Sequence, residues 1–160
     1  HPGIRPCNVT AVLAKVMEEY ARRALLKGIA IRADRSNAPC IVPVDPEILT
    51  EALGHLMDNA VKFSSRGCIR TEIRRTAYGQ EKERRVEIVI ADEGIGIPAS
   101  RIGVVQDSFR QASEGYTRLY EGIGLGLTIA TRLVELMRGS LRMESTEGRG
   151  TTVLVSLPAE

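Results

Sequence analysis

Two features that mark membrane proteins and disulfide-rich proteins are missing from this sequence of 160 residues. It has no uninterrupted apolar run near the roughly 18 residues that cross a bilayer, and no basic-then-apolar leader at its start. Cysteine is scarce: Cys7, Cys40 and Cys68 are an odd number, lie far apart, and form neither a CxxC pair nor a cluster with histidine. We therefore expect a soluble chain from a reducing compartment, without a disulfide framework or a zinc site.

An excess of either charge is lacking too. The chain has 22 Lys and Arg against 20 Asp and Glu, a net charge of +2, and the two signs are interspersed. Basic residues are dense only around the segment "AYGQEKE", namely Arg70, Arg74, Arg75, Lys82, Arg84 and Arg85. Because no aromatic residues are interleaved with them, we favour a solvated hairpin tip over a nucleic-acid surface and expect no nucleic-acid partner.

Hydrophobic periodicity predicts an α+β fold. Residues 11–26 and 46–61 have the apolar spacing of helices, with Gly28 ending the first and Asp45 capping the second. Strands are expected at 29–33, 40–44, 68–75, 84–92, 140–145 and 150–158, and a third helix, closed by Gly139, precedes the last two. This order favours a single domain over 1–160, a two-layer α/β sandwich with helices on one face of a mixed, mostly antiparallel sheet.

The stretch 98–121 has no sustained period and is rich in polar residues, with Pro98, Gly103 and Gly115 spread along it. A connection of this length is unusual in a compact domain unless it has a function. We expect it to form a lid.

The helix predicted at 46–61 carries three polar residues on one face. His55, Asn59 and Lys62 stand at positions i, i+4 and i+7, opposite an apolar stripe. An amide oxygen is a hard ligand that suits Mg²⁺, and a lysine one turn later would reach phosphates held by the same metal. A solvated helix face is the alternative for each residue taken alone.

A second candidate site lies in "VEIVIADEGIGIP", where Asp92 shares one side of a strand with three apolar residues. A buried carboxylate needs a hydrogen-bond donor, because leaving it unpaired costs several kcal/mol. The donor is either the backbone of the "EGIG" turn or a ligand, such as the exocyclic amine of a purine. Gly94 and Gly96 would then let a flat ring approach the backbone.

The third candidate is "EGIGLGL", in which Gly122, Gly124 and Gly126 precede an amphipathic helix. A helix N-terminus presents unpaired N–H groups, and glycines before it let an anion contact the backbone. The segment matches neither the P-loop nor the dinucleotide-binding pattern. A purine acceptor, a metal ligand, a cation and an anion cradle together favour a nucleoside triphosphate with Mg²⁺.

In these segments the sequence resembles the ATP-binding catalytic domain of bacterial two-component sensor histidine kinases, within the superfamily that includes DNA gyrase, Hsp90 and MutL. "LGHLMDNAVKFS" (53–64) is similar to the N box, "DEGIGIP" (92–98) to the G1 box, "SFRQAS" (108–113) to the F box and "GIGLGL" (122–127) to the G2 box. The resemblance covers nearly the whole chain. It implies a Bergerat-type fold with ATP and Mg²⁺ as ligands and 98–121 as the ATP lid.

The resemblance also implies roles for individual residues. Asn59 would hold Mg²⁺, Lys62 would contact phosphate, and Asp92 would accept the adenine amine. The other nucleotide-binding residues that it implies are Gly94, Gly96, Ile97, Arg118, Gly122, Gly124, Leu125, Gly126 and Thr151. His55 and Arg110 join Asn59 and Lys62 as candidate catalytic residues, with Arg110 near the terminal phosphates.

Several positions depart from the family pattern. His55 stands where many sensor kinases have asparagine; as in chemotaxis kinases it would help to polarise the attack, or it is a surface histidine. Glu121 and Ile123 replace the usual Gly and Thr of the G2 box, and Gln106 and Ser108 replace a Phe and a Pro around the F box. These changes bear on turnover more than on nucleotide binding.

The family's phosphoacceptor is a histidine on a separate helical dimerisation domain, in a segment resembling H-E-x-x-x-P. The only histidines here, His1 and His55, are not in such a segment. We therefore expect the chain to bind ATP and to donate the γ-phosphoryl group to that domain of the same full-length protein, with little autophosphorylation alone. The resemblance also implies a downstream response regulator receiver domain, a homodimeric full-length protein, a monomeric fragment and a cytoplasmic location, with a membrane-bound sensor as one setting.

Two other classes stay open. One is an ATP-driven conformational module or an anti-sigma-type Ser/Thr kinase of the same superfamily. The other is a degenerate scaffold that keeps the fold and has lost nucleotide binding. An ATP and Mg²⁺ titration separates the scaffold from the rest.

Overall fold

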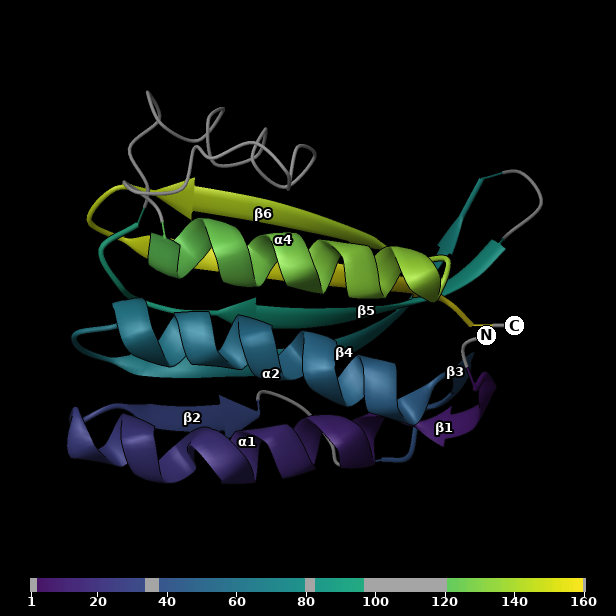
Figure 1. The fold of residues 1–160 in the computed structure, drawn as a ribbon, viewed down its shortest axis with the longest axis horizontal. Coiled ribbons are helices and arrows are strands. Elements are labelled where there is room, and N and C mark those ends of the chain that lie inside the picture. The colour runs from purple at the N-terminus through teal and green to yellow at the C-terminus, as the bar shows by residue number, and fades with distance from the viewer. Residues whose placement is uncertain (1–2, 34–37, 80–82, 97–120, 160) are drawn as a thin grey trace.

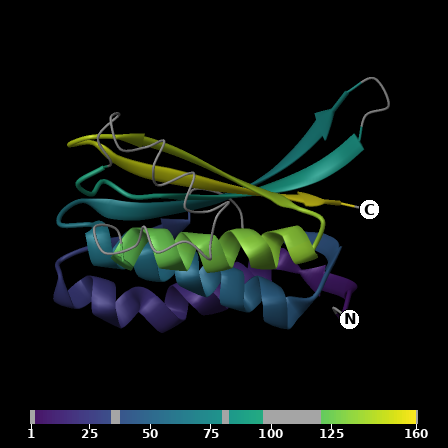
Figure 2. The same ribbon diagram turned by 45° about the horizontal axis from the view of Figure 1, so that its top comes forward.

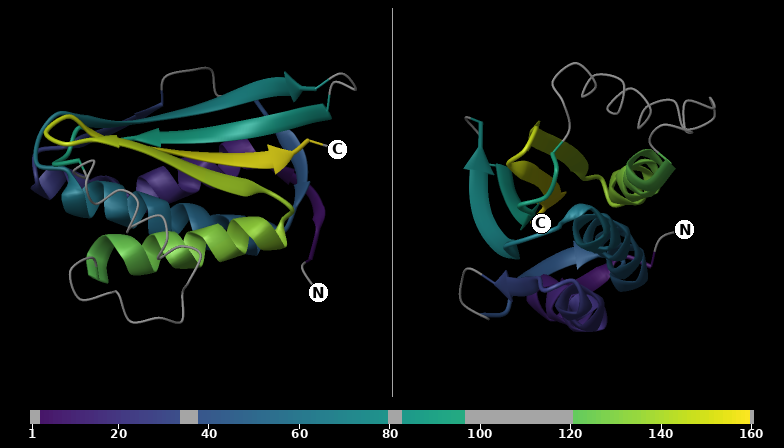
Figure 3. Two further views of the ribbon diagram at one scale, coloured as in Figure 1. Left: turned by 90° about the horizontal axis from the view of Figure 1, so that it is seen from above. Right: turned by 90° about the vertical axis from the view of Figure 1, so that its left-hand side faces the viewer.

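The computed structural model describes residues 3–33, 38–79, 83–96 and 121–159. In these ranges the helices form one layer and a five-stranded sheet forms the other, as Figures 1 and 2 show. The elements are β1 (Arg5–Asn8), α1 (Val9–Leu26), β2 (Ala30–Ala33), β3 (Ile41–Val44), α2 (Pro46–Phe63), β4 (Cys68–Tyr78), β5 (Glu83–Ala91), α4 (Glu121–Leu136), β6 (Ser140–Thr146) and β7 (Gly150–Pro158). The predicted α+β sandwich, with helices on one face of the sheet, is confirmed (Figure 3). No helix in these ranges is both long and apolar enough to cross a bilayer.

The five-stranded sheet is mixed, as predicted. Its strand order is β2-β4-β5-β7-β6; β2 runs parallel to β4, and the other neighbours are antiparallel. The predicted hairpins β4–β5 and β6–β7 both form, and the end of β4 and the start of β5 extend beyond the other strands (Figure 2). In the central strand, Ile88 lies opposite Ile73 on one side and Val155 on the other, so a row of aliphatic side chains faces the helices.

The N-terminal strand β1 was missed by the sequence analysis. It pairs antiparallel with β3, placing Cys7 opposite Val42, so β2 and β3 belong to different sheets although they lie on either side of one turn signal. Its four residues, RPCN, are too few to show alternation and include a proline. Only the pairing with β3 defines it as a strand.

Asp45 begins α2 as predicted, with Pro46 at the first helical position. Its Oδ1 accepts hydrogen bonds from the backbone N–H of Glu47 at 2.9 Å and of Ile48 at 3.3 Å. Its Oδ2 accepts a third from the N–H of Gly3 at 2.6 Å. Asp45 therefore also ties the N-terminal segment to the start of α2.

The two helix ends assigned to glycine differ. Gly28 follows α1 with φ of 75°, the left-handed conformation that glycine adopts without strain. After α4 that conformation belongs to Arg138, with φ of 60°, and not to Gly139. Gly139 is required for space instead, because a Cβ there would lie 2.5 Å from the carbonyl oxygen of Ser156 in β7.

The core lies between the layers and α2 runs through its middle. The stripe predicted to be apolar is buried: Leu49, Leu53, Leu56 and Ala60 are all at most 4% exposed. Because α2 packs against α1 on one side, α4 on the other and β5 above, its position is set from three directions (Figure 1). The backbone under the remaining face of α2, which carries His55, Asn59 and Lys62, is therefore fixed relative to α1, α4 and the sheet.

Asp45 makes the stability of the fold depend on pH in the acidic range. The hydrogen bond from Gly3, and then those from Ile48 and Glu47, lower the pKa of its carboxyl group against the opposing effect of burial. A lowered pKa stabilises the folded state above the unfolded value, about pH 4, and this stabilisation is lost as the pH falls through the folded value.

We expect Asp45→Ala to lower the unfolding temperature at pH 7, because it removes the helix cap and the link to Gly3. Asp45→Asn, which still caps a helix, should lower it less. Circular dichroism melts from pH 7 to pH 2.5 measure this, and the wild type and Asp45→Ala should converge at the acidic end. A gap that stays constant over the whole range would contradict the assignment.

Candidate functional site

α2 ends and α4 begins at the same end of the molecule (Figure 1). Residues of both helices line a pocket there. Its lining comes from both layers: Leu56, Asn59, Ala60, Phe63, Ile90, Asp92, Ile95, Gly96, Leu127, Met143, Thr151 and Val153. Four predicted site residues, Asn59, Asp92, Gly96 and Thr151, are among them, although they come from three separate parts of the chain. The fold therefore brings a carboxylate, an amide and a hydroxyl to one largely apolar pocket.

Asp92 follows the last residue of β5, and backbone groups hold its carboxyl group. Oδ1 accepts hydrogen bonds from the N–H of Gly94 at 2.9 Å and from the N–H of Thr151 at 3.2 Å. The N–H of Asp92 in turn donates to the carbonyl oxygen of Thr151 at 2.9 Å. Within the described ranges no protein donor reaches Oδ2, so one oxygen is fixed and the other remains available to a ligand.

The pKa of Asp92 is raised. Burial is the largest cause, and the two backbone hydrogen bonds from Gly94 and Thr151 oppose it. Desolvation disfavours the charged form, so keeping the carboxyl group of Asp92 ionised lowers the stability of the fold. A donor on a bound ligand would offset that cost.

Gly94 and Gly96 are needed for close packing of the loop after β5. A Cβ on Gly94 would overlap the carbonyl oxygen of Phe63, and one on Gly96, which has φ of 67°, would overlap that of Thr146. The sequence analysis assigned these glycines to the approach of a flat ring. The structure shows a further reason for them, since they let the loop lie against the end of α2 and the end of β6.

Asn59 lies where α2 meets α4. A Cβ on Gly126 would lie 3.1 Å from Oδ1 and 3.2 Å from Nδ2 of Asn59, so glycine leaves room for the carboxamide between the helices. This contact pairs the N box with the G2 box. Sequence spacing could not reveal it, because 66 residues of chain separate the two positions.

The glycine-rich segment does not precede its helix as expected. α4 begins at Glu121, so Gly122 and Gly124 lie in its first turn, and Leu125 and Gly126 lie in its second. Glycine disfavours helix, so its propensity alone does not predict a helix here. In a helix, the N–H groups after the first turn are bonded to carbonyl groups of the helix itself. The anion-binding groups would therefore be the first N–H groups of α4 itself.

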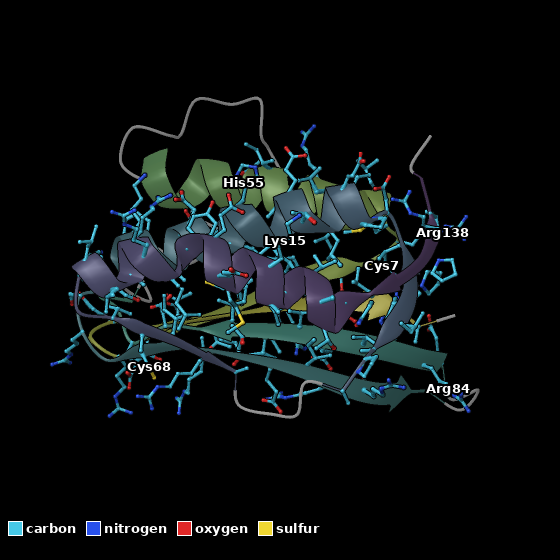
Figure 4. All side chains as sticks on the ribbon, turned by 90° about the horizontal axis from the view of Figure 1, so that it is seen from below. Cys7, Lys15, His55, Cys68, Arg84 and Arg138 are labelled. Carbon is cyan, nitrogen blue, oxygen red and sulfur yellow. The ribbon has the colours of Figure 1, made fainter. Side chains whose placement is uncertain are left out.

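Lys62 and His55 complete the polar face of α2. Lys62 is exposed on the last turn of the helix. His55 lies one turn before Asn59 with its side chain 32% exposed, and its Nε2 is 3.9 Å from Oε1 of Glu51 (Figure 4). That distance suits an ion pair when the ring is protonated but is too long for a hydrogen bond.

Part of the predicted site falls outside the described residues. Ile97, Arg110 and Arg118 lie there, with all of the predicted lid except its last residue, Glu121. Glu121 is the first residue of α4.

Sequence reasoning missed most of the apolar lining. Phe63 lies in the N box and Ile95 in the G1 box, but the sequence pattern predicted no role for either. Met143 on β6 and Val153 on β7 alternate correctly for burial, and alternation does not distinguish a pocket wall from the core. They reach the pocket only because β7 pairs with β5 beside Asp92.

The space that the lining encloses is about 30 Å³, room for one or two waters. Ile95 is 57% exposed, whereas Leu56 and Ala60 in the same lining are buried, so the side chain of Ile95 borders solvent.

A family model described as "Histidine kinase-, DNA gyrase B-, and HSP90-like ATPase" matches residues 44–160. Sensor histidine kinase AruS of Pseudomonas aeruginosa is 40% identical over 106 residues, which are 66% of this chain and 10% of AruS. The chain spans less than a third of the length of the curated relatives that it matches.

Two solved structures have a similar fold. The mycobacterial sensor histidine kinase MprB superimposes with a TM-score of 0.76 at 28% identity over 98% of both chains. Full-length ShkA in complex with AMPPNP gives the same TM-score at 25% identity, over 99% of this chain and 31% of ShkA. The chain therefore belongs to the histidine kinase-, DNA gyrase B- and HSP90-like ATPase family, as a catalytic ATPase domain of the sensor histidine kinase type.

Proposed function

We propose that this chain binds ATP with Mg²⁺ in the pocket beside Asp92 and donates the γ-phosphoryl group to a histidine on a separate dimerisation domain. The observation that carries the proposal is the Asp92 carboxyl group, with Oδ1 fixed by two backbone N–H groups and Oδ2 available beside an apolar pocket. The adenine amine is a donor of the right kind, and the apolar lining suits a planar ring. The AMPPNP complex of ShkA supports this ligand class.

The phosphates would extend from the pocket toward the end of α2 and the start of α4. Asn59 would hold Mg²⁺ through its amide oxygen, and the described residues contain no cluster of three or more His, Cys, Asp or Glu that could hold a metal instead. A Mg²⁺ ion held by Asn59 would supply positive charge beside the phosphates. Lys62 and the first N–H groups of α4 would contact the same oxygens.

The remaining residues would act around the phosphates. Gly94, Gly96 and Ile97 would line the adenine side, with Thr151 beside Asp92. Gly122, Gly124, Leu125 and Gly126 would follow the phosphates along α4. Arg110 and Arg118 would contribute from the lid, and His55 would help to polarise the attack from the face of α2.

We extend the proposal to the whole protein. Residues 1–160 would form one ATP-binding domain with a lid at 98–121, and the acceptor histidine would lie on a dimerisation domain of the same protein. A response regulator would take the phosphoryl group from that histidine, since the relatives are sensor kinases. The full-length protein would be a homodimer, the isolated chain a monomer, and the site cytoplasmic, where ATP is supplied.

The first test is a calorimetric titration with ATP and Mg²⁺. Asp92→Asn should weaken binding at least about tenfold, because hydrogen bonds to charged groups are worth about 1.5–3 kcal/mol. Asn59→Ala should remove the part of the affinity that depends on Mg²⁺. Absence of measurable binding by the wild type would favour a scaffold that has lost nucleotide.

The same Asp92→Asn variant should not be less stable at pH 7. Its amide oxygen still accepts from Gly94 and Thr151, and the desolvated charge is gone. Because the pKa is raised, the stabilisation from the protonated form is full below the unfolded value and lost as the pH rises through the folded value. A large drop in unfolding temperature at pH 7 would show that Asp92 acts mainly in folding.

Gly126→Ala tests the contact with Asn59. The new methyl would press on the carboxamide, so we expect the Mg²⁺-dependent affinity to fall several-fold while the helix gains up to about 1 kcal/mol. Gly54→Ala on α2 is the matched control, since its Cβ would meet only the hydroxyl of Tyr20 at 3.9 Å. If both variants bind nucleotide and Mg²⁺ equally well, the proposal that Asn59 holds the metal would be contradicted.

The isolated chain should incorporate little acid-labile phosphate from labelled ATP. The full-length protein, which supplies the acceptor histidine, should incorporate it readily. Abundant phosphohistidine on the isolated chain, at His1 or His55, would contradict the proposed division between domains.

A further inference from the structure

The C-terminal end of α2 is held by other segments. An α-helix leaves its last four carbonyl groups without partners inside the helix. Here the carbonyl oxygen of Ala60 accepts from the N–H of Ser64 at 3.1 Å, and that of Phe63 accepts from the N–H of Ile95 at 3.4 Å. The loop after β5 therefore satisfies one of the four.

Lys27 satisfies the other two. Its Nζ donates to the carbonyl oxygen of Val61 at 2.7 Å and to that of Lys62 at 3.0 Å. The carbonyl of Val61 is partly buried, so water is a poor substitute for the lysine. One side chain outside α2 thus completes the end of the helix that carries the phosphate-side residues.

The backbone of Lys27 is itself fixed. It is the C-cap of α1, and its N–H donates to the carbonyl oxygens of Ala24 and Leu25. Gly28 turns the chain directly afterwards. α1 and α2 run in the same direction and end side by side (Figure 1). Each helix end carries about half a negative charge, and two such ends repel one another. The ammonium group of Lys27 contacts the end of α2 and offsets negative charge there.

We propose that Lys27 is a positioning residue for nucleotide binding, which acts by ordering the last turn of α2. This turn carries Lys62 and Phe63; Phe63 lines the pocket, and its carbonyl receives the N–H of Ile95. If the turn frays, the candidate phosphate contact and the pocket wall move together with the loop that follows Asp92. The inference rests on the proposed function, because the ligand is the one proposed there. Within the described ranges, Lys27 hydrogen-bonds to backbone carbonyl groups of α2 and is not among the residues that line the pocket.

Three variants separate this role from a general loss of charge. Lys27→Met removes the donor and keeps most of the length of the side chain. Lys27→Arg keeps a cation with several N–H donors. Lys15→Met is the matched control, because Lys15 is exposed on α1 and no hydrogen bond or ion pair of its side chain is found within the described ranges (Figure 4).

The first readout is the affinity for ATP with Mg²⁺ by calorimetry. We expect Lys27→Met to weaken binding about fivefold or more, at the lower end of the usual coupling between separate sites. Lys27→Arg should restore most of the affinity, and Lys15→Met should leave it unchanged. In the full-length protein, Lys27→Met should raise KM for ATP more than it lowers kcat.

The second readout is amide hydrogen exchange without nucleotide. Exchange at residues 61–64 should be faster in Lys27→Met, while the middle of α2 and the strands β5 and β7 keep wild-type rates. A general loss of stability would speed exchange everywhere and would overturn the inference. Wild-type rates at residues 61–64 would overturn it as well.

The two proposals fail in different ways. If the wild type binds no ATP, the proposed function falls, and the role of Lys27 in binding falls with it. If the wild type and Lys27→Met bind ATP equally, the positioning role alone is overturned and the proposed function stands.

Discussion

The carboxyl group of Asp92 is held by two backbone N–H groups, and the functional end of the molecule is arranged around that constraint. One N–H belongs to the turn that follows β5, and the other belongs to β7, so the side chain joins a loop to the sheet. The strand pairing next to it brings Thr151 and Val153 to the same pocket. The cost of desolvating the carboxylate remains, as its raised pKa shows. Desolvated carboxyl groups of this kind are frequent at functional sites, and a donor on a ligand would offset the cost.

The second organising element is α2, which lies between α1 and α4 and reaches the pocket with its last turns. Gly126 leaves space for Asn59 on one side of the helix, and Lys27 secures its end from the other. The proposed phosphate and metal site would need groups from α2 and α4 to keep a constant separation. Packing of α2 on three sides supplies that constancy without any contribution from the ligand.

Much of the fold follows from local signals. Asp45 and Pro46 mark the start of α2, and alternation in β4, β5 and β7 marks the hairpin strands and their buried faces. Signals were weaker where a pairing partner decides the outcome. β1 is a strand only through β3, and the first turns of α4 are helical although three of their residues are glycine. Local propensity is a weak guide when packing on a neighbouring helix compensates for it.

The sequence by itself determined the layered architecture and the identity of the chemical groups, because periodicity and residue type are local properties. The family follows from the same boxes, since their order and spacing are read along the chain. Only the tertiary structure decided which oxygen of Asp92 is occupied, that Gly126 faces Asn59, and that Lys27 closes the end of α2. Each of these depends on the distance between atoms of segments far apart in the chain, and only the packing of the two layers sets that distance.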